Sequence, residues 1–284
     1  MFTRLSNSWQ LVKASAAVLS ADKELLIFPI ISAIGSIIVM LTFAVPMFLA
    51  GVFDAFVSEQ LVGLRIVGYL MGFAFYLVQY TVIIFCNSAL VGAAHIRLKG
   101  GDPTVGDGFR IATQHIGSIL GYAAISATVG VILRNVSERG GVIGQLAASF
   151  IGLAWNVATY LAVPVLVIEG VGPLEALKRS VSLLKKTWGE QIVGNFGIST
   201  IFGLLTVVVI FLVGIPLIFM AIVSQSVPLI VAAVGLLVFL LVAIGLISSA
   251  LGGIYSAALY QYAVSGEAGK FFDDEMIRHA FRRK

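Results

Sequence analysis

Six long apolar runs are the feature that most restricts the fold of this 284-residue chain. A helix needs roughly 20 mostly apolar residues to cross the hydrocarbon core of a bilayer. Because lipid offers no hydrogen bonds, backbone groups there must be satisfied internally, and each run is predicted to be an α-helix. The predicted spans are residues 25–50, 64–94, 116–133, 142–168, 192–223 and 228–263. The sequence therefore predicts an all-α, polytopic membrane helix bundle with six transmembrane helices.

The composition agrees with lipid as the main solvent. The chain is 59% hydrophobic and 11% charged, whereas soluble domains carry about 25% charged residues. Its net charge of +4 is compatible with binding nucleic acid, but the placement of the basic residues favours a membrane surface, and no nucleic acid partner is expected. The one cysteine, Cys86, lies within an apolar run and excludes a disulfide framework.

The basic residues predict the orientation. Of the 18 Lys and Arg residues, all but Arg65, Arg134 and Arg139 lie before the first span, between spans two and three, between spans four and five, or after span six. Short loops rich in Lys and Arg stay cytoplasmic. Both termini are therefore predicted to be cytoplasmic.

Residues 173–188 form the most polar long segment and are predicted to be an interfacial amphipathic helix on the cytoplasmic leaflet. Its apolar stripe is Leu174, Leu177, Val181, Leu184 and Trp188, with Trp188 at headgroup depth. Its basic face holds Lys178, Arg179, Lys185 and Lys186. This face either anchors the bundle to anionic headgroups or docks a cytoplasmic protein partner or a specific lipid.

Similar amphipathic segments precede the first and third spans, and another closes the chain. The sequence thus reads as three parallel units, each a cytoplasmic amphipathic helix followed by a hairpin of two spans. We expect one integral membrane domain over residues 1–284. It comprises an amphipathic segment at 1–24, the six-span bundle at 25–263 and a C-terminal helix at 264–284.

No pattern typical of catalysis or metal binding is found. Glu169 ends the fourth span and is expected to pair with a nearby cation. His95, His115 and His279 lack the i, i+4 spacing of a helical metal site. The glycine-rich residues 100–108 lack the Lys-Ser/Thr of a phosphate loop. No enzyme activity and no cofactor are therefore expected.

Neutral polar residues within the predicted spans carry more information. Such side chains avoid lipid, so they are predicted to face the bundle interior and to hydrogen-bond across helices. They are Gln79, Asn87, Asn156, Asn195, Ser248 and Ser249. Small residues such as Ser249, Gly253 and Ser256 predict close helix packing, with a homo-oligomer seam or a lipid groove as alternatives.

Three stretches carry a resemblance to a known family: SADKELLIFPIIS, VGAAHIRLKGGDPTVGDGFR and VPVLVIEGVGPLEALKRSVSLLKKTWGE. The chain resembles uncharacterised bacterial six-span membrane proteins that are defined only as a domain of unknown function. The last stretch also resembles, more weakly, membrane domains attached to glycerophosphodiester phosphodiesterases. Because their catalytic domain has no counterpart here, the resemblance implies a bacterial inner-membrane protein without phosphodiesterase activity.

These observations favour a non-catalytic multi-pass membrane protein that organises membrane lipid or a protein partner at the cytoplasmic face. The alternative is a channel or transporter for an uncharged or amphipathic solute, lined by Asn87, Asn156, Asn195 and Ser248. An enzyme acting within the membrane ranks third, because no nucleophile–base pair or carboxylate pair falls in the spans.

Overall fold

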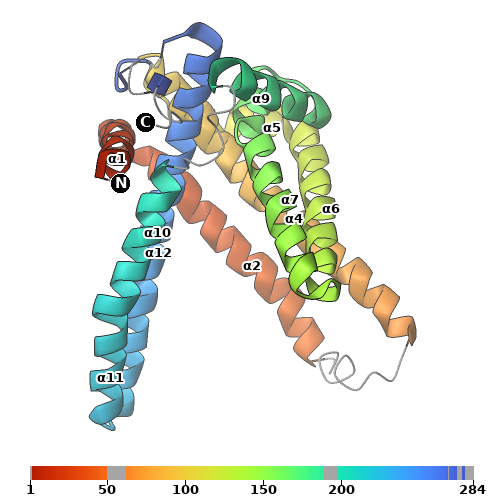
Figure 1. Ribbon diagram of the computed structural model, residues 1–284, viewed down its shortest axis with the longest axis vertical. Helices are drawn as coiled ribbons and strands as arrows, with labels where there is room; N and C mark the ends of the chain where they lie inside the picture. Colours follow the sequence, from red (N-terminus) through yellow and green to blue (C-terminus); the bar gives the residue numbers. More distant parts are fainter. Residues whose placement is uncertain (1, 50–61, 189–196, 268, 274–276, 279–284) are drawn as a thin grey trace.

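The computed structural model describes residues 2–49, 62–188, 197–267, 269–273 and 277–278, and the regular elements in these ranges are all helical (Figure 1). In chain order they are α1 (Phe2–Ala21), η1 (Lys23–Leu26), α2 (Ile27–Leu49), α4 (Val62–Leu98), α5 (Val105–Gln114), α6 (Ile116–Arg139), α7 (Gly141–Thr159), α8 (Ala162–Ile168), α9 (Pro173–Trp188), α10 (Gly197–Val209), the π-helical η3 (Ile210–Gly214), α11 (Ile215–Val223) and α12 (Val227–Ser265).

The prediction of six spans is confirmed. Six helical segments are long and apolar enough to cross a membrane: Lys23–Leu49, Leu70–Leu98, Ile116–Arg139, Gly141–Ile168, Ile201–Val223 and Val227–Ser265. Most of their ends lie within a few residues of the predicted ones. The start predicted for the fifth span, at 192–196, lies outside the described residues. The chain is therefore a multi-pass membrane protein.

The spans form three hairpins, and the third separates from the other two toward one end (Figure 1), whereas α4 and α6 stay in contact through Tyr76 and Arg134. The first hairpin is α2 with α4, the second is α6 with α7 and α8, and the third is α10, η3 and α11 with α12. We call the end that carries α1, α5 and α9 the junction end, and the opposite end the splayed end. Of the helices in the third hairpin, α11 packs against its own neighbours η3 and α12.

The buried core follows the same division. Most of its members lie in the junction half of the spans: Phe28 in α2, Ile84–Leu98 in α4, Ile119–Ala127 in α6, Ala162–Val167 in α8 and Ala250–Tyr260 in α12. Toward the splayed end the large apolar side chains are exposed, as Leu212 (72%) and Val231 (66%) show. In a membrane these side chains face lipid, so they need no protein partner.

The junction between α4 and α5 is held by local sequence signals. Helix α4 ends in a Schellman motif, in which Gly101 N–H donates to Ile96 O (3.0 Å) and Gly100 N–H to Arg97 O (2.9 Å). Gly100 has φ +90°, a conformation that favours glycine. Helix α5 then begins with a capping box between Thr104 and Asp107. Hydrogen bonds from Thr104 lower the pKa of Asp107.

Arg97 joins three segments at this end. Its Nη2 donates to Ala21 O at the end of α1 (2.6 Å), and its Nη1 donates to Gly101 O (3.1 Å) and to Asp102 Oδ1 (2.8 Å). The neighbouring Asp22 is buried, and burial raises its pKa although Arg97 opposes the shift. One guanidinium thereby fixes the position of α1 relative to α4 and the loop before α5.

Close packing around α5 depends on Gly108. A Cβ at this position would collide with Phe28 Cζ and would lie 2.8 Å from Ala89 O. The absence of a side chain lets α5 lie against α2 and α4, with Phe109 packed edge-on against Phe28 at a ring distance of 5.3 Å.

Two interruptions in the spans are explained by proline. Pro164 cannot donate a backbone hydrogen bond, and the fourth span breaks at residues 160–161 between α7 and α8. The Leu161 N–H there donates to Ser180 Oγ of α9 (3.1 Å). In the fifth span, Pro216 follows the π-helical turn η3, a local adjustment typical of such sites.

Candidate functional site

Two neighbouring cavities lie at span depth in the junction half of the bundle. The first, of about 390 Å³, lies among α2, α4 and α12. Its polar lining is made of uncharged side chains: Ser32, Asn87, Ser248, Ser249 and Ser256. Small residues in α12, including Gly252 and Gly253, leave the space that forms it.

The second cavity, of about 430 Å³, lies among α4, α6, α7 and α8. Its polar lining is again uncharged and includes Tyr80, Tyr122, Ser126, Asn156 and Thr159. The two cavities share Ile83, Asn87, Tyr160 and Ser256. These four residues therefore separate two adjoining polar spaces.

Both cavities lie well inside the hydrocarbon layer. Asn87 and Ser256 lie about two and a half to three helical turns before the span ends at Leu98 and Ser265, which is roughly 13–17 Å at 1.5 Å per residue. The hydrocarbon core is about 30 Å thick. The shared residues thus lie several helical turns inside the spans, where an uncharged polar lining is far less costly than a charged one.

The structure places the polar residues predicted for the interior in different surroundings. Asn87 lines both cavities, Asn156 lines the second, and Ser248 and Ser249 line the first. Asn156 and Ser249 are exposed without a membrane around them. Gln79 is half-buried, and its Oε1 has no hydrogen-bond partner among the described residues.

Asn195 lies outside the described residues. Sequence reasoning did not single out Tyr160, which lines both cavities. Tyrosine in membrane proteins concentrates at the interfaces. Tyr160 lies within the predicted fourth span and not at its end, and this position was the signal in the sequence that could have identified it.

Helix α9 covers the junction ends of the second and third hairpins. The side chains that it buries are Ala176, Ser180, Leu183 and Leu184, so the packed face is turned from the predicted stripe. Of that stripe, Leu184 is buried, whereas Leu174 (64%) and Val181 (45%) are exposed. The hydroxyl of the buried Ser180 lies at the α7–α8 break, where it accepts a hydrogen bond from the Leu161 N–H. This contact explains why α9 is rotated relative to the predicted stripe.

The predicted basic face of α9 is exposed at all four positions: Lys178, Arg179, Lys185 and Lys186. Leu174, Lys178, Val181 and Lys185 follow one another at helical spacing, so exposed apolar and basic side chains share one stripe. Lysine can bury its stem along apolar surface while its ammonium group stays in a polar layer. Trp188 ends the helix, and its side chain is outside the described part of the structure.

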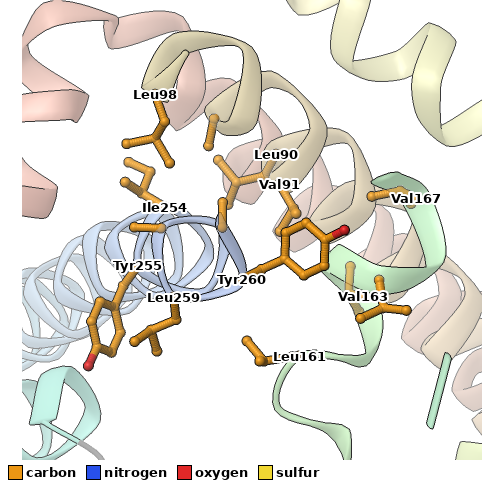
Figure 2. Packing of buried hydrophobic residues seen from close by; sticks show 14 of the residues in the cluster. Leu90, Val91, Leu98, Leu161, Val163, Val167, Ile254, Tyr255, Leu259 and Tyr260 are labelled. Carbon is orange, nitrogen blue, oxygen red and sulfur yellow. The ribbon is translucent and has the colours of Figure 1, made fainter. Parts of the chain in front are cut away.

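Glu169 forms the ion pair that the sequence predicts. Its Oε1 lies 3.3 Å from Arg179 Nε and accepts a hydrogen bond from the Tyr260 hydroxyl at 3.1 Å. Figure 2 shows Tyr260 reaching from α12 toward Val163 and Val167 of α8. The contact thus joins the second hairpin, α9 and the last span.

The remaining candidates are spread apart. Within the described ranges, no three His, Cys, Asp or Glu side chains gather as metal ligands would. His95 packs edge-on against Tyr260 at a ring distance of 6.2 Å, His115 lies beside Gly170, and His279 falls outside the described residues.

The fold defines a multi-pass helical membrane protein, and the polar lining of its two cavities is uncharged. Residues 66–271 match the model of a family described as a family of unknown function, DUF6159. Because this match covers most of the chain, the protein belongs to that family. No curated protein matches the chain.

Proposed function

We propose that this protein is a non-catalytic membrane protein that binds and organises lipid. The observation that carries the proposal is that the two cavities lie between hairpins: the first is lined by α2, α4 and α12, and the second by α4, α6, α7 and α8. The cavities offer hydroxyl and amide groups, and the diverging hairpins offer apolar surface on the same side of the junction. An amphipathic molecule fits this pairing, with its uncharged polar part in a cavity and its chains between hairpins.

The absence of charge in the lining selects the class of ligand. A full charge near the middle of the bilayer would be unpaired and costly, whereas hydroxyl, ester or amide groups find partners in Asn87, Asn156 and the serines. The polar part is therefore a neutral one, such as the glycerol ester region of a lipid. Proteins with unfilled polar cavities in lipid pay a desolvation cost, which such a ligand offsets.

The test compares lipids retained by the purified full chain. Asn87→Leu replaces the amide shared by both cavities with an apolar group of similar size, and we expect it to reduce co-purifying lipid, measured by native mass spectrometry. Thr42→Val is the matched control. Thr42 is exposed, and its hydroxyl donates to Ile38 O in its own helix (2.8 Å), so this change should leave retention unaltered. Equal retention in both variants would refute the proposal.

Transport of an uncharged or amphipathic solute is the second candidate, because the two cavities adjoin through Asn87, Tyr160 and Ser256. A continuous passage would let a fluorescent neutral lipid exchange between leaflets in proteoliposomes. Exchange that is faster with the wild-type protein than with Asn87→Leu would favour transport. Retention of lipid without exchange would favour a static binding role.

We propose further that the protein resides in a bacterial inner membrane with its junction end in the cytoplasm. The excess of Lys and Arg in the segments at that end supports this orientation. Ser182 of α9 and Ser137 near the splayed end of α6 provide matched labelling positions. In intact cells an impermeant thiol reagent should label Ser137→Cys and leave Ser182→Cys unlabelled; the reverse pattern would invert the orientation.

A further inference from the structure

A third pocket, of about 820 Å³, opens at the junction end and is separate from the two cavities. Three spans end on its wall, at Leu98, Ile168 and Ser265. Spans end where hydrocarbon gives way to the polar headgroup layer. The pocket therefore lies at headgroup depth, and its volume is within the range of about 300–1,000 Å³ that is usual for ligand sites.

The wall of this pocket has an apolar side and a charged side. Leu98, Ile168, Val264 and Phe272 form the apolar side. The charged side holds Lys99, Lys270 and Glu267, none of which forms an ion pair with another described residue, and Asp273 also lines the pocket.

Lys270 lies close to the backbone of the residue that follows Lys99. Lys270 Nζ lies 3.3 Å from the position that a Cβ on Gly100 would occupy, so its side chain crosses the residue that directly follows Lys99. The pocket wall thus carries two lysines without an ion-pair partner among the described residues and the carboxylates of Glu267 and Asp273. A simple anion would meet repulsion from Glu267, and a simple cation would meet repulsion from both lysines.

A ligand that carries both signs of charge satisfies all three groups. The Gln261 side chain adds an acceptor, because its buried Oε1 has no hydrogen-bond partner among the described residues. Unsatisfied buried acceptors are costly, and an ammonium group supplies several donors. The apolar side and the headgroup depth call for a molecule with acyl chains.

We propose that this pocket binds a phospholipid whose headgroup joins a phosphate to a primary ammonium group. Lys99 and Lys270 contact the phosphate, and Glu267 with Gln261 receives the ammonium. The acyl chains leave along Ile168 and Val264. This site goes beyond the proposed function, since it uses other residues and a zwitterionic rather than a neutral group.

The test measures lipid binding to the detergent-purified full chain by native mass spectrometry. Three lipids serve as probes. Phosphatidylethanolamine has the phosphate and the primary ammonium group, phosphatidylcholine keeps both charges but lacks N–H donors, and phosphatidylglycerol lacks the cation. We expect the first to bind about tenfold more tightly than the other two, as for hydrogen bonds to charged groups. Lys99→Gln with Lys270→Gln should weaken its binding at least tenfold. Glu267→Gln should abolish the preference over phosphatidylglycerol.

Lys23→Gln is the matched control, because Lys23 is an exposed lysine at the junction end that does not line the pocket. Melting temperatures of all variants report folding separately from binding.

Water-soluble glycerophosphoethanolamine, which has the headgroup without acyl chains, tests whether the ligand is a lipid. If it competes with phosphatidylethanolamine at an equal concentration, the lipid assignment is overturned. Equal affinity for all three lipids, or unchanged binding in the double lysine variant, would overturn the site itself. The Asn87→Leu variant should keep the preference for phosphatidylethanolamine. A failure of this lipid site can therefore be distinguished from a failure of the proposed function.

Discussion

The junction end and the splayed end of the same six spans are built by different means. At the junction end, glycines allow helices to touch, caps satisfy backbone groups, and Arg97 and Glu169 each bind several segments. At the splayed end, α11 packs within its own hairpin, and side chains such as Phe211 (62% exposed) point outward. The comparison teaches that most of the buried core lies in one half, and that lipid covers much of the apolar surface of the other half.

The largest contrast is expected from one substitution made in both regions. Phe28→Ala removes a ring that is 1% exposed at the junction end, and loss of a buried aromatic side chain costs about 3–5 kcal/mol. Phe211→Ala removes a ring that faces lipid, so it should cost less than about 1 kcal/mol, because lipid chains fill the space. Reversible unfolding in mixed micelles measures both changes. Equal losses would erase the distinction between the two regions.

The second contrast concerns charge. Replacing Lys178, Lys185 and Lys186 with Gln should weaken association with anionic lipid by about 1 kcal/mol per charge, and salt should reduce the difference. The melting temperature should change little, because all three side chains are exposed. Lipid association is measured in nanodiscs of mixed anionic and zwitterionic lipid. If the triple variant associates with anionic lipid at low salt as strongly as the wild type, the basic face of α9 serves only to set the membrane topology.

Two adjacent glycines in α12 provide the third contrast. A Cβ on Gly253 would collide with Leu90 and lie 3.3 Å from Asn87 Oδ1, whereas a Cβ on Gly252 meets nothing within 4 Å. Gly253→Ala should therefore destabilise by about 1–3 kcal/mol through overpacking. Gly252→Ala should be neutral or stabilising by up to about 1 kcal/mol, because alanine favours helix. Thermal unfolding separates them, and a similar loss at both positions would contradict the packing.

Two serines of α9 provide the smallest contrast. Ser180→Ala leaves the Leu161 N–H at the α7–α8 break without its acceptor, at a cost of roughly 1–2 kcal/mol. Ser182 is exposed, so Ser182→Ala should have almost no effect. Hydrogen exchange at Leu161 tests the mechanism directly. Unchanged protection in Ser180→Ala would show that another group satisfies this amide.

The sequence predicts the spans well, because long apolar runs have one stable form in lipid. It also predicts the pairing of Glu169, since a carboxylate at a span end next to a basic helix has obvious partners. The predicted stripe of α9 misses Ser180, because a hydropathy pattern ranks serine as polar and cannot show that a broken helix needs an acceptor. The separation of the hairpins was not predicted, because apolar residues that face lipid and those that face protein look alike in sequence.

The candidate site was predicted in part for the same reason. Asn87, Asn156, Ser248 and Ser249 stand out as polar residues in apolar runs, and all four line a cavity. Their grouping into two adjoining cavities depends on which helices meet, and one sequence does not specify that. The charged pocket brings Lys99 together with Glu267 and Lys270, which lie far from it in sequence, and each of the three resembles an ordinary loop residue.

The docking of α1 has a consequence for the order of assembly. Leu11, Val12 and Val18 are buried in a helix that packs against α10 and α12, which come from the opposite end of the sequence. Contacts between such distant segments form late, because the loop that they close is long. Until the third hairpin has inserted, the apolar face of α1 has no protein partner on that side and must rest on the bilayer surface. Helix α1 precedes the other described helices in the chain, yet it is thus among the last of them to reach its final position.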